Sequence, residues 1–510
     1  MFTGNPGQLY MLASLTLFLF LIIWLSPVYA GNSFISDNEY TVRVNDDLSV
    51  MQVEACFSSL PMTLFARESG AGKYLLQRPS GFRLVNGRLR QQHPERGTCI
   101  HYVVDLGRVV SEVRLPGVPY HDHTNAVTTP GSWLWLPAEN SHPLRVKFIL
   151  PRSIHVSAPW LLLQRGSTVT EYSLPIADDS HDSIVAIGDF PVETIHVSGA
   201  KIRLAVLHGN PRPDTDSIRQ WLQYGAQSIV ALYGHFPLPD PQVLVFPIGH
   251  ADEPVPWGQI QRGGESSIQL FIDQTRPMQE LIADWTLTHE LTHMTHPYLP
   301  MDGRWLTEGI ATYYQYVLRA RMGTISPQYA WQELDEGFAR GRQQTREGES
   351  LLNASINMHD THEYMRVYWS GTAFALLTDW QLRRAHRGSL DDTLAEFRRC
   401  CLPARKKWST ADFVSKLDEI SGTDVFSETF TQIINSDRFP SLDRVYRFLG
   451  LETGNGQLVI ADHADGLAIR TDIMRSGPSR TAHGDSLSTP LLVKSLTPDK
   501  HGRCRHVPDI

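Results

Sequence analysis

Two histidines and a glutamate have the spacing of a metal-binding helix. His289, Glu290 and His293 stand in the stretch HELTH. Residues four apart share one face of a helix, so both imidazoles can reach the same ion. Neutral imidazoles suit Zn2+, and a glutamate directly after the first histidine can polarise a bound water rather than coordinate. The stretch therefore predicts a hydrolytic site with one Zn2+ per chain.

The third ligand is expected on the following helix. Glu308 opens a second helical stretch after the turn PYLPMDGRW, with fourteen residues between it and His293. Antiparallel helices joined by a short loop can bring this carboxylate back to the histidines. The alternative for Glu308 is a carboxylate that only stabilises a helix N-terminus. His296 is interpreted as a helix-end residue rather than a ligand, because Pro297 follows it at once.

This set of residues favours hydrolysis of an amide bond. A zinc-bound water has a lowered pKa, and the ion polarises the carbonyl that is attacked. Glu290 would take the water proton and later pass it to the leaving amine. The tetrahedral oxyanion then needs a second electrophile, which a tyrosine or histidine from a later helix could supply.

Two stretches resemble a known peptidase family. WLTEGIATYY, which contains Glu308, resembles the third-ligand segment of gluzincin aminopeptidases, and most of all that of the glycyl aminopeptidase family. YWSGTAFALLTDWQLRRAHRGSLDDTL, from Tyr368 to Leu394, is similar to that family's tyrosine, variable residue, lysine-glycine and apolar helix. Ser370 stands where the family has the lysine. Together with the N-terminal β pattern, the resemblance extends from about Tyr40 to Gly450.

The resemblance implies a role for each matching residue. His289, His293 and Glu308 would be the zinc ligands. Glu290 would be the catalytic base. Tyr368 would support the oxyanion, and the alternative for it is an aromatic core residue of a helix.

The order of sequence patterns predicts several domains. Short β-branched and aromatic runs, interrupted by Gly, Pro, Asn and Asp, are typical of a β-sandwich or barrel. They give way to helical spacing from Asp214, then to two strands, and then to one helix from about Pro277 to Thr295 and further helices. The expected fold class is α+β multidomain, with a β-sandwich-like N-terminal domain, a thermolysin-like zinc catalytic domain, as the resemblance implies, and an α-helical C-terminal domain. The expected bounds are a signal peptide or anchor at 1–30, the β domain at 31–205, the catalytic domain at 206–322, the helical domain at 323–450 and a partly irregular tail at 451–510.

The segment RGGESS differs from the element with which related aminopeptidases hold a substrate amine. Glu265, next to Gly264, could pair with an α-ammonium group, or it could be an exposed turn residue. Gly258, Gly263 and Gly264 could form a closely approached or mobile edge, or a simple turn. We therefore expect an aminopeptidase, with a restricted-specificity endopeptidase and a non-catalytic zinc-binding scaffold as alternatives. The intact Glu290 argues against the scaffold.

The N-terminal segment and the charge balance restrict location and partners. The uncharged stretch from Tyr10 to Ala30, with Pro27 near its end, is typical of a secretory signal peptide, and an uncleaved membrane anchor is the alternative. Both place the remaining chain outside the cytoplasm, secreted or periplasmic. The net charge of −8 gives no basic excess for nucleic acid, so the expected partner is a peptide or protein substrate.

The cysteines suit an oxidising compartment. Cys56 and Cys99 lie in one strand-rich region and are the favoured disulfide. Cys400, Cys401 and Cys504 cannot all pair with one another. No spacing among these residues indicates a metal site.

Two other histidine-containing stretches are interpreted as structural. The residues HDH at 121–123 stand in a loop rich in Pro, Thr and Asn without a partner motif. His362 and Glu363 precede a later helix and are expected to form a solvated turn.

Overall fold

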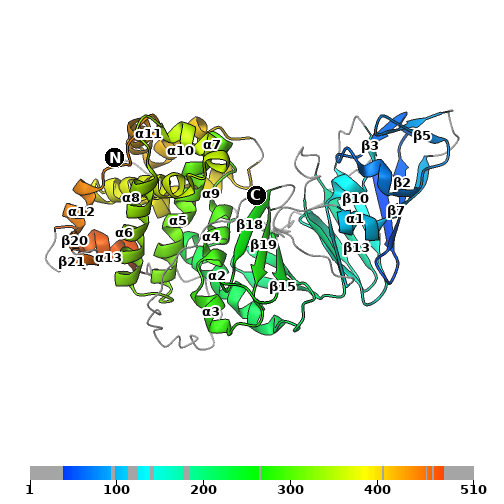
Figure 1. Cartoon of the computed structure of the whole chain (residues 1–510), viewed down its shortest axis with the longest axis horizontal. Coiled ribbons are helices and arrows are strands. Elements are labelled where there is room, and N and C mark those ends of the chain that lie inside the picture. The colour runs from blue at the N-terminus through cyan, green and yellow to red at the C-terminus, as the bar shows by residue number, and fades with distance from the viewer. Residues whose placement is uncertain are drawn as a thin grey trace, which may run out of the picture. The chain divides into compact units, whose positions relative to one another are not determined.

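The structure, a computed structural model, describes most of the chain. The described residues are 38–92, 98–112, 124–137, 143–175, 183–262, 266–404, 407–454, 457–461 and 465–475. They form a β-rich N-terminal part, a central part that combines a sheet with helices, and a helical C-terminal part (Figure 1). This order confirms the predicted α+β multidomain fold class. The expected signal peptide or anchor at 1–30 and the HDH stretch lie outside the described residues.

Alternating side chains build the N-terminal part. In β1 (Asn38–Val44), Tyr40, Val42 and Val44 are buried, whereas the residues between them are not. This period of two places one face of the sheet on a core that includes Trp133. The main sheet runs in the order β12 (Leu161–Arg165), β13 (Val169–Leu174), β10 (Leu144–Ile149), β1, β2 (Val50–Phe57), β7 (Cys99–Asp105) and β4 (Leu75–Gln77).

Smaller elements complete the N-terminal part. One sheet contains β5 (Phe82–Val85), β6 (Arg88–Gln91), β3 (Thr63–Phe65) and β9 (Leu136–Pro137). Another contains β11 (His155–Ser157), β14 (Val185–Gly188) and β8 (Asn125–Thr128). The helix α1 (Leu106–Glu112) directly follows β7.

The disulfides agree with the favoured pairing. Cys56 of β2 lies directly opposite Cys99 of β7 in the sheet, and the two are bonded. This confirms the predicted disulfide. Cys400 and Cys401, which are neighbours in the chain, form a second one. Cys504 lies outside the described residues.

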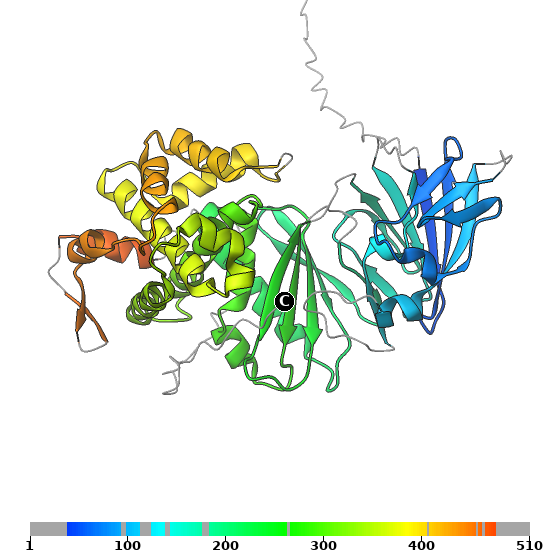
Figure 2. The same ribbon diagram turned by 45° about the horizontal axis from the view of Figure 1, so that its top comes forward.

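The central sheet carries the helices of the site. It runs in the order β15 (Val192–Val197), β16 (Ala200–Val206), β17 (Gln242–Pro247), β19 (Ser266–Ile272) and β18 (Trp257–Arg262). β16, β17 and β19 are parallel, and β15 and β18 pair antiparallel with their neighbours. Figure 2 shows the arrows of this sheet in shades of green. Both faces are covered, which explains why β17 and β19 are nearly continuous apolar runs. The sheet begins before the expected boundary at 205, because β16 pairs with β17.

A buried arginine joins the central sheet to the N-terminal part. Arg203 of β16 is 1% exposed. Its Nη1 donates to the carbonyl of Ala158 at 2.6 Å, and its Nη2 donates to that of Trp160 at 3.0 Å. Its Nε donates to Asp240 Oδ1 at 2.9 Å. The charge of this arginine is therefore satisfied from both parts.

The single helix expected from Pro277 to Thr295 is wrong. The structure has α3 (Met278–Ala283), α4 (Thr286–Thr292) and a 3-10 turn from His293 to Thr295. Asp284 has an extended backbone, and its carboxylate accepts from the amide of Thr286 at 2.7 Å. An aspartate that bonds an amide two residues on competes with helical bonding, so the chain restarts as a new helix here.

The helices after α4 form the C-terminal part. They are α5 (Arg304–Arg321), α6 (Pro327–Gln344), α7 (Leu351–Thr361), α8 (Tyr364–Arg384), α9 (Leu390–Cys401), α10 (Thr410–Ser421), α11 (Val425–Ile434) and α12 (Asp443–Leu449). The hairpin of β20 (Leu451–Gly454) and β21 (Gln457–Ile460) and the helix α13 (Leu467–Met474) follow. Serine side chains cap α6, α7, α9 and α10, each accepting from an amide three residues on. The expected solvated turn before α8 is only half correct, because Glu363 is buried and pairs with Arg346.

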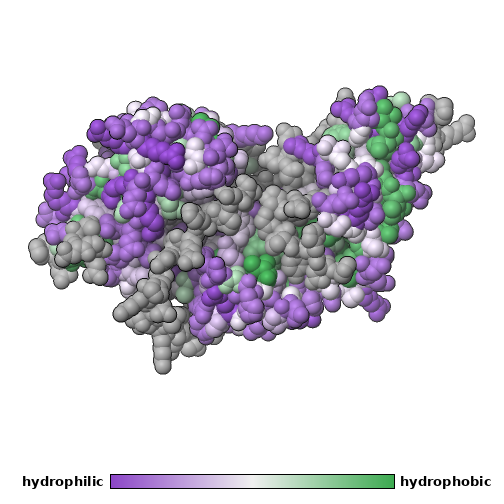
Figure 3. Space-filling view, viewed as in Figure 1, coloured by the Kyte–Doolittle hydropathy of each residue, from purple (hydrophilic) through white to green (hydrophobic). Residues whose placement is uncertain are grey.

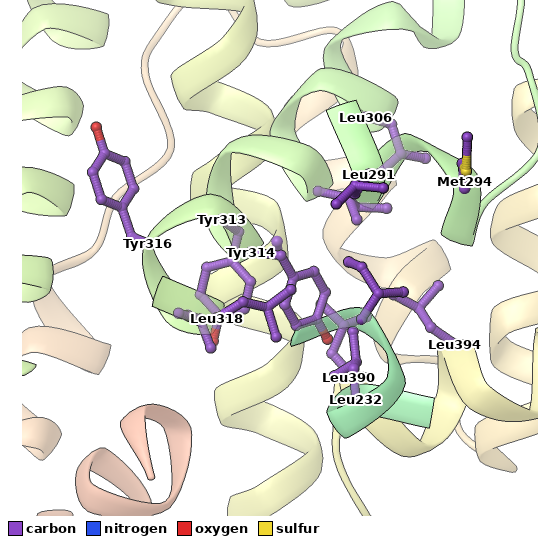
Figure 4. Packing of buried hydrophobic residues seen from close by; sticks show 14 of the residues in the cluster. Leu232, Leu291, Met294, Leu306, Tyr313, Tyr314, Tyr316, Leu318, Leu390 and Leu394 are labelled. Atoms are coloured by element: carbon purple, nitrogen blue, oxygen red, sulfur yellow. The ribbon is translucent and has the colours of Figure 1, made fainter. Parts of the chain in front are cut away.

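The helix α2 (Thr215–Tyr233) and the helices around α5 share one hydrophobic core. Leu232 of α2, Leu291 of α4, Tyr314 of α5 and Leu394 of α9 belong to it (Figure 4).

On the face shown in Figure 3, the described residues are largely hydrophilic. Among the described residues, no helix has both the length and the apolar composition needed to cross a membrane.

α5 and α8 cross at very short distance. A Cβ on Gly309 of α5 would lie 2.2 Å from the Cα of Gly371 of α8. Real Cβ atoms do not approach so closely, so only glycine allows this crossing. Glu308 precedes Gly309, and Tyr368 lies one turn before Gly371 on the helix. The crossing therefore brings Tyr368 to the carboxylate of Glu308.

A buried ionic network holds α5, α8 and α9 together. Asp379 of α8 has no exposed surface and accepts from Tyr313 at 2.8 Å, Arg383 at 2.9 Å and the amide of Leu390 at 2.9 Å. Asp391 of α9 accepts a hydrogen bond from Nη2 of Arg383 through its Oδ2 at 3.2 Å. Such a network satisfies its buried charges only while every partner is present.

Candidate active site

Three predicted ligands form a nearly equilateral triangle. The Nε2 atoms of His289 and His293 are 3.2 Å apart, and each is 3.3 Å from Glu308 Oε2. Ligand atoms held about 2.0–2.2 Å from a tetrahedral ion lie about 3.3–3.6 Å from one another. The triangle thus has the size of one face of a tetrahedral zinc site, and all three side chains are buried.

The donor chemistry of this triangle also fits Zn2+. Two imidazole nitrogens and one carboxylate oxygen are the ligands of many catalytic zinc sites. The fourth position of such a tetrahedron stays open for water or substrate. The residues present therefore fit the expected ion.

The orientation of His289 is fixed by a residue that the sequence analysis missed. The Nδ1 of His289 lies 2.9 Å from Gln315 Oε1. An amide oxygen can only accept, so Nδ1 carries the proton and the lone pair of Nε2 faces the triangle. Gln315 is seven residues after Glu308 and thus on the same face of α5. This heptad spacing is the signal that could have found it.

Charge in the triangle favours a cation. Burial alone would raise the pKa of Glu308, but the adjacent His293 and His289 hold it well below its ordinary value. Burial alone would lower the pKa of His289, but the carboxylates of Glu308 and Glu290 raise it above its ordinary value. Both directions have one cause, which is the attraction between the imidazoles and the carboxylates in a desolvated place.

The expected base lies against the edge strand of the central sheet. Glu290 is 6% exposed. A Cβ on Gly258 of β18 would lie 2.8 Å from Glu290 Cγ and 2.5 Å from Thr286 Cγ2. Any side chain at position 258 would displace one of these two residues. Of the alternatives for Gly258, the structure supports the closely approached edge.

Tyr368 lies beside the triangle. Its ring stacks parallel to the imidazole of His289, with centroids 6.3 Å apart. Burial, followed by the charge of Glu308, raises the pKa of Tyr368 well above its ordinary value. The phenol therefore keeps its proton and can donate a hydrogen bond.

Other side chains surround the triangle. Trp285 is 37% exposed and meets the ring of His289 edge-on at 5.4 Å. Arg304 donates to Glu308 Oε1 over 3.4 Å. The guanidinium carbon of Arg304 lies 5.7 Å from the ring centre of Tyr298, an exposed residue of the turn before α5. The sequence did not predict roles for Trp285 and Arg304, although each lies four residues before a predicted ligand.

The remaining candidates have different outcomes. His296 follows the 3-10 turn, as a helix-end residue should, but it is buried and stacks edge-on against His293 at 5.3 Å. Its Nδ1 lies 3.1 Å from the carbonyl of Pro297. Glu265 and Gly264, the predicted substrate-binding residues, lie outside the described residues.

The described fold has relatives among solved structures. An aminopeptidase N family protein from Idiomarina loihiensis aligns over 81% of this chain and 78% of its own, with 15% identity and a TM-score of 0.62. An M1 zinc metallopeptidase from Deinococcus radiodurans aligns over 80% of this chain and 94% of its own, with 13% identity and a TM-score of 0.46. No family model and no curated protein matches the sequence. The first likeness shows that the chain shares its fold with this aminopeptidase N family protein.

Proposed function

We propose that the chain is a zinc-dependent peptidase, and more narrowly an aminopeptidase. One observation carries the proposal: His289, His293 and Glu308 form a buried triangle of tetrahedral size, with Glu290 next in the chain to its first member. The fold shared with an aminopeptidase N family protein supports the narrower statement. Its substrate is a peptide or protein.

The roles of the residues follow from their positions. His289, His293 and Glu308 would hold the ion, and Gln315 keeps the imidazole of His289 turned toward it. Zinc, when bound there, supplies a Lewis acid that lowers the pKa of water and polarises a carbonyl. The carboxylate of Glu290 accepts the proton of the attacking water and returns it to the nitrogen of the leaving amine.

The substrate backbone has a candidate platform in β18. This strand ends the order of the central sheet, and its Gly258 touches Glu290. An extended peptide can add to such an edge through main-chain hydrogen bonds. A peptide bound there would pass close to the base and the triangle.

Tyr368 is proposed to donate a hydrogen bond to the developing oxyanion. We expect Tyr368→Phe to lower kcat by about 10²- to 10³-fold, as does the loss of one oxyanion donor elsewhere. Steady-state kinetics and a thermal unfolding curve of the same preparation check this. A lower melting temperature with unchanged kcat would instead restore the alternative of an aromatic core residue.

Metal analysis and peptide hydrolysis test the function itself. The purified protein is expected to contain one zinc per chain and to cleave unblocked peptides one residue at a time from the N-terminus. Removal of the metal with a chelator should abolish cleavage, and added Zn2+ should restore it. Far less than one zinc per chain, with no effect of added Zn2+, would contradict the proposal.

The same assay separates the aminopeptidase from the second candidate. N-acetylated peptides lack the free α-ammonium group that an aminopeptidase recognises. Equal cleavage of acetylated and free peptides would favour the restricted-specificity endopeptidase. A secreted or periplasmic location, and attachment to a membrane through the N-terminal segment, stay predictions.

A further inference from the structure

Arg304 has hydrogen-bonding capacity that the described residues do not use. Its Nη1 donates to Glu308 Oε1 over 3.4 Å. Its Nε is buried and has no hydrogen-bond partner within the described part of the chain. A guanidinium carries several N–H donors in a planar fork and remains charged. The side chain as a whole is 27% exposed, so part of Arg304 is accessible to a bound molecule.

Helix stability does not explain an arginine at this place. Arg304 is the first residue of α5. The N-terminal end of a helix carries partial positive charge, which disfavours a cation there. The carboxylate of Glu308 offers Arg304 only one of its two oxygens, because the other oxygen faces His289 and His293.

The charge count of the site leaves Arg304 in surplus. The charges of Glu290 and Glu308 together offset those of one Zn2+. Burial would lower the pKa of Arg304, but Glu308 and the neighbouring tyrosines raise it above its ordinary value. Zn2+, Arg304, Glu290 and Glu308 together therefore have one positive charge more than negative charges.

We propose that Arg304 binds a carboxylate of the substrate close to the bond that is cleaved. This inference rests on the proposed function. The shared chemistry is a planar carboxylate, which a guanidinium binds through two parallel hydrogen bonds. The carboxylate could be the C-terminus of a very short peptide or the side chain of a neighbouring Asp or Glu. Arg304 would then determine specificity while Glu290 and the triangle perform the chemistry.

Matched peptide pairs test the proposal and separate the two carboxylate sources. Ala-Ala and Ala-Ala-amide differ only in the C-terminal charge. Ala-Glu-amide and Ala-Gln-amide, and likewise Glu-Ala-amide and Gln-Ala-amide, differ only in a side-chain charge. For at least one pair we expect Arg304→Met to lower kcat/KM for the charged member about 10- to 100-fold more than for its neutral partner. Arg304→Lys should recover part of that preference.

Arg219→Met is the matched control. Arg219 is a surface residue of α2 that pairs with Glu193 and Asp216. Its replacement should change neither member of any pair. An equal loss for charged and neutral peptides in Arg304→Met would overturn the proposal and indicate an effect on Glu308 alone.

Binding without turnover gives an independent readout. Calorimetric titration of zinc-loaded Glu290→Gln protein with each charged and neutral peptide should show the same preference, and the added Arg304→Met change should remove it. Zinc content should stay at one per chain in both proteins. Cleavage of the amides by the wild type with no charge preference would contradict this inference but leave the proposed function intact. No cleavage of any peptide by zinc-loaded wild type would contradict both.

Discussion

Replacing Glu290 by glutamine is expected to lower kcat for peptide hydrolysis by about 10²- to 10⁴-fold, the usual contribution of a general base. Glutamine has nearly the same shape, so it still fits against Gly258 of the edge strand. Residue 290 is not one of the three proposed ligands, which are His289, His293 and Glu308. The zinc content should therefore stay at one per chain. Kinetics and metal analysis of the same preparation measure both quantities.

The matched control for this change is Glu280→Gln. Glu280 lies on α3, the helix before α4, and its side chain is 44% exposed. It pairs with Arg276 at the surface and should not affect turnover. If Glu290→Gln retains turnover within twofold of the control, Glu290 is not the base. If the Glu290→Gln variant loses zinc together with turnover, Glu290 contributes to metal binding instead.

Replacing Asp379 by alanine should cost about 3–5 kcal/mol in the free energy of unfolding, the cost of breaking a buried ion pair on one side. The change removes an acceptor from the hydroxyl of Tyr313, from Arg383 and from the amide of Leu390. Of its two carboxylate partners in the described part of the chain, Arg383 would keep Asp391. Urea denaturation followed by tryptophan fluorescence measures the loss.

A surface aspartate provides the comparison for this stability effect. Asp360 of α7 is exposed. Asp360→Ala should therefore change the free energy of unfolding by no more than about 0.5 kcal/mol. Similar unfolding midpoints for the two variants would show that the network around Asp379 contributes little.

Residue type and spacing were sufficient to predict the triangle. A spacing of four on one helix, and a short connection to the next, leave few other places for the two imidazoles of His289 and His293 and for the carboxylate of Glu308. Tyr368 came from the resemblance alone, and its position depends on a helix crossing at Gly309 that no local pattern indicates.

The remaining features depend on tertiary packing. Helical periodicity continues across Asp284, so only the bond from Thr286 reveals the break between α3 and α4. The apolar sequences of β15 and β16 resemble those of the N-terminal strands, because the sequence of a strand does not show which sheet it joins. Gln315 and Arg304 are polar residues on the face of Glu308, and their meaning appears only beside the histidines.

The carbonyl acceptors around Arg203 bear on how the protein can be divided. A fragment that starts at 206 would lose β15 and nearly all of β16, and β17 would become an open sheet edge. A fragment that starts before β15 keeps the sheet but loses the carbonyls of Ala158 and Trp160. Arg203 would then donate to water or to a neighbouring molecule instead of to these two carbonyls. The N-terminal strands thus help to pack the central sheet, and we expect their removal to destabilise it.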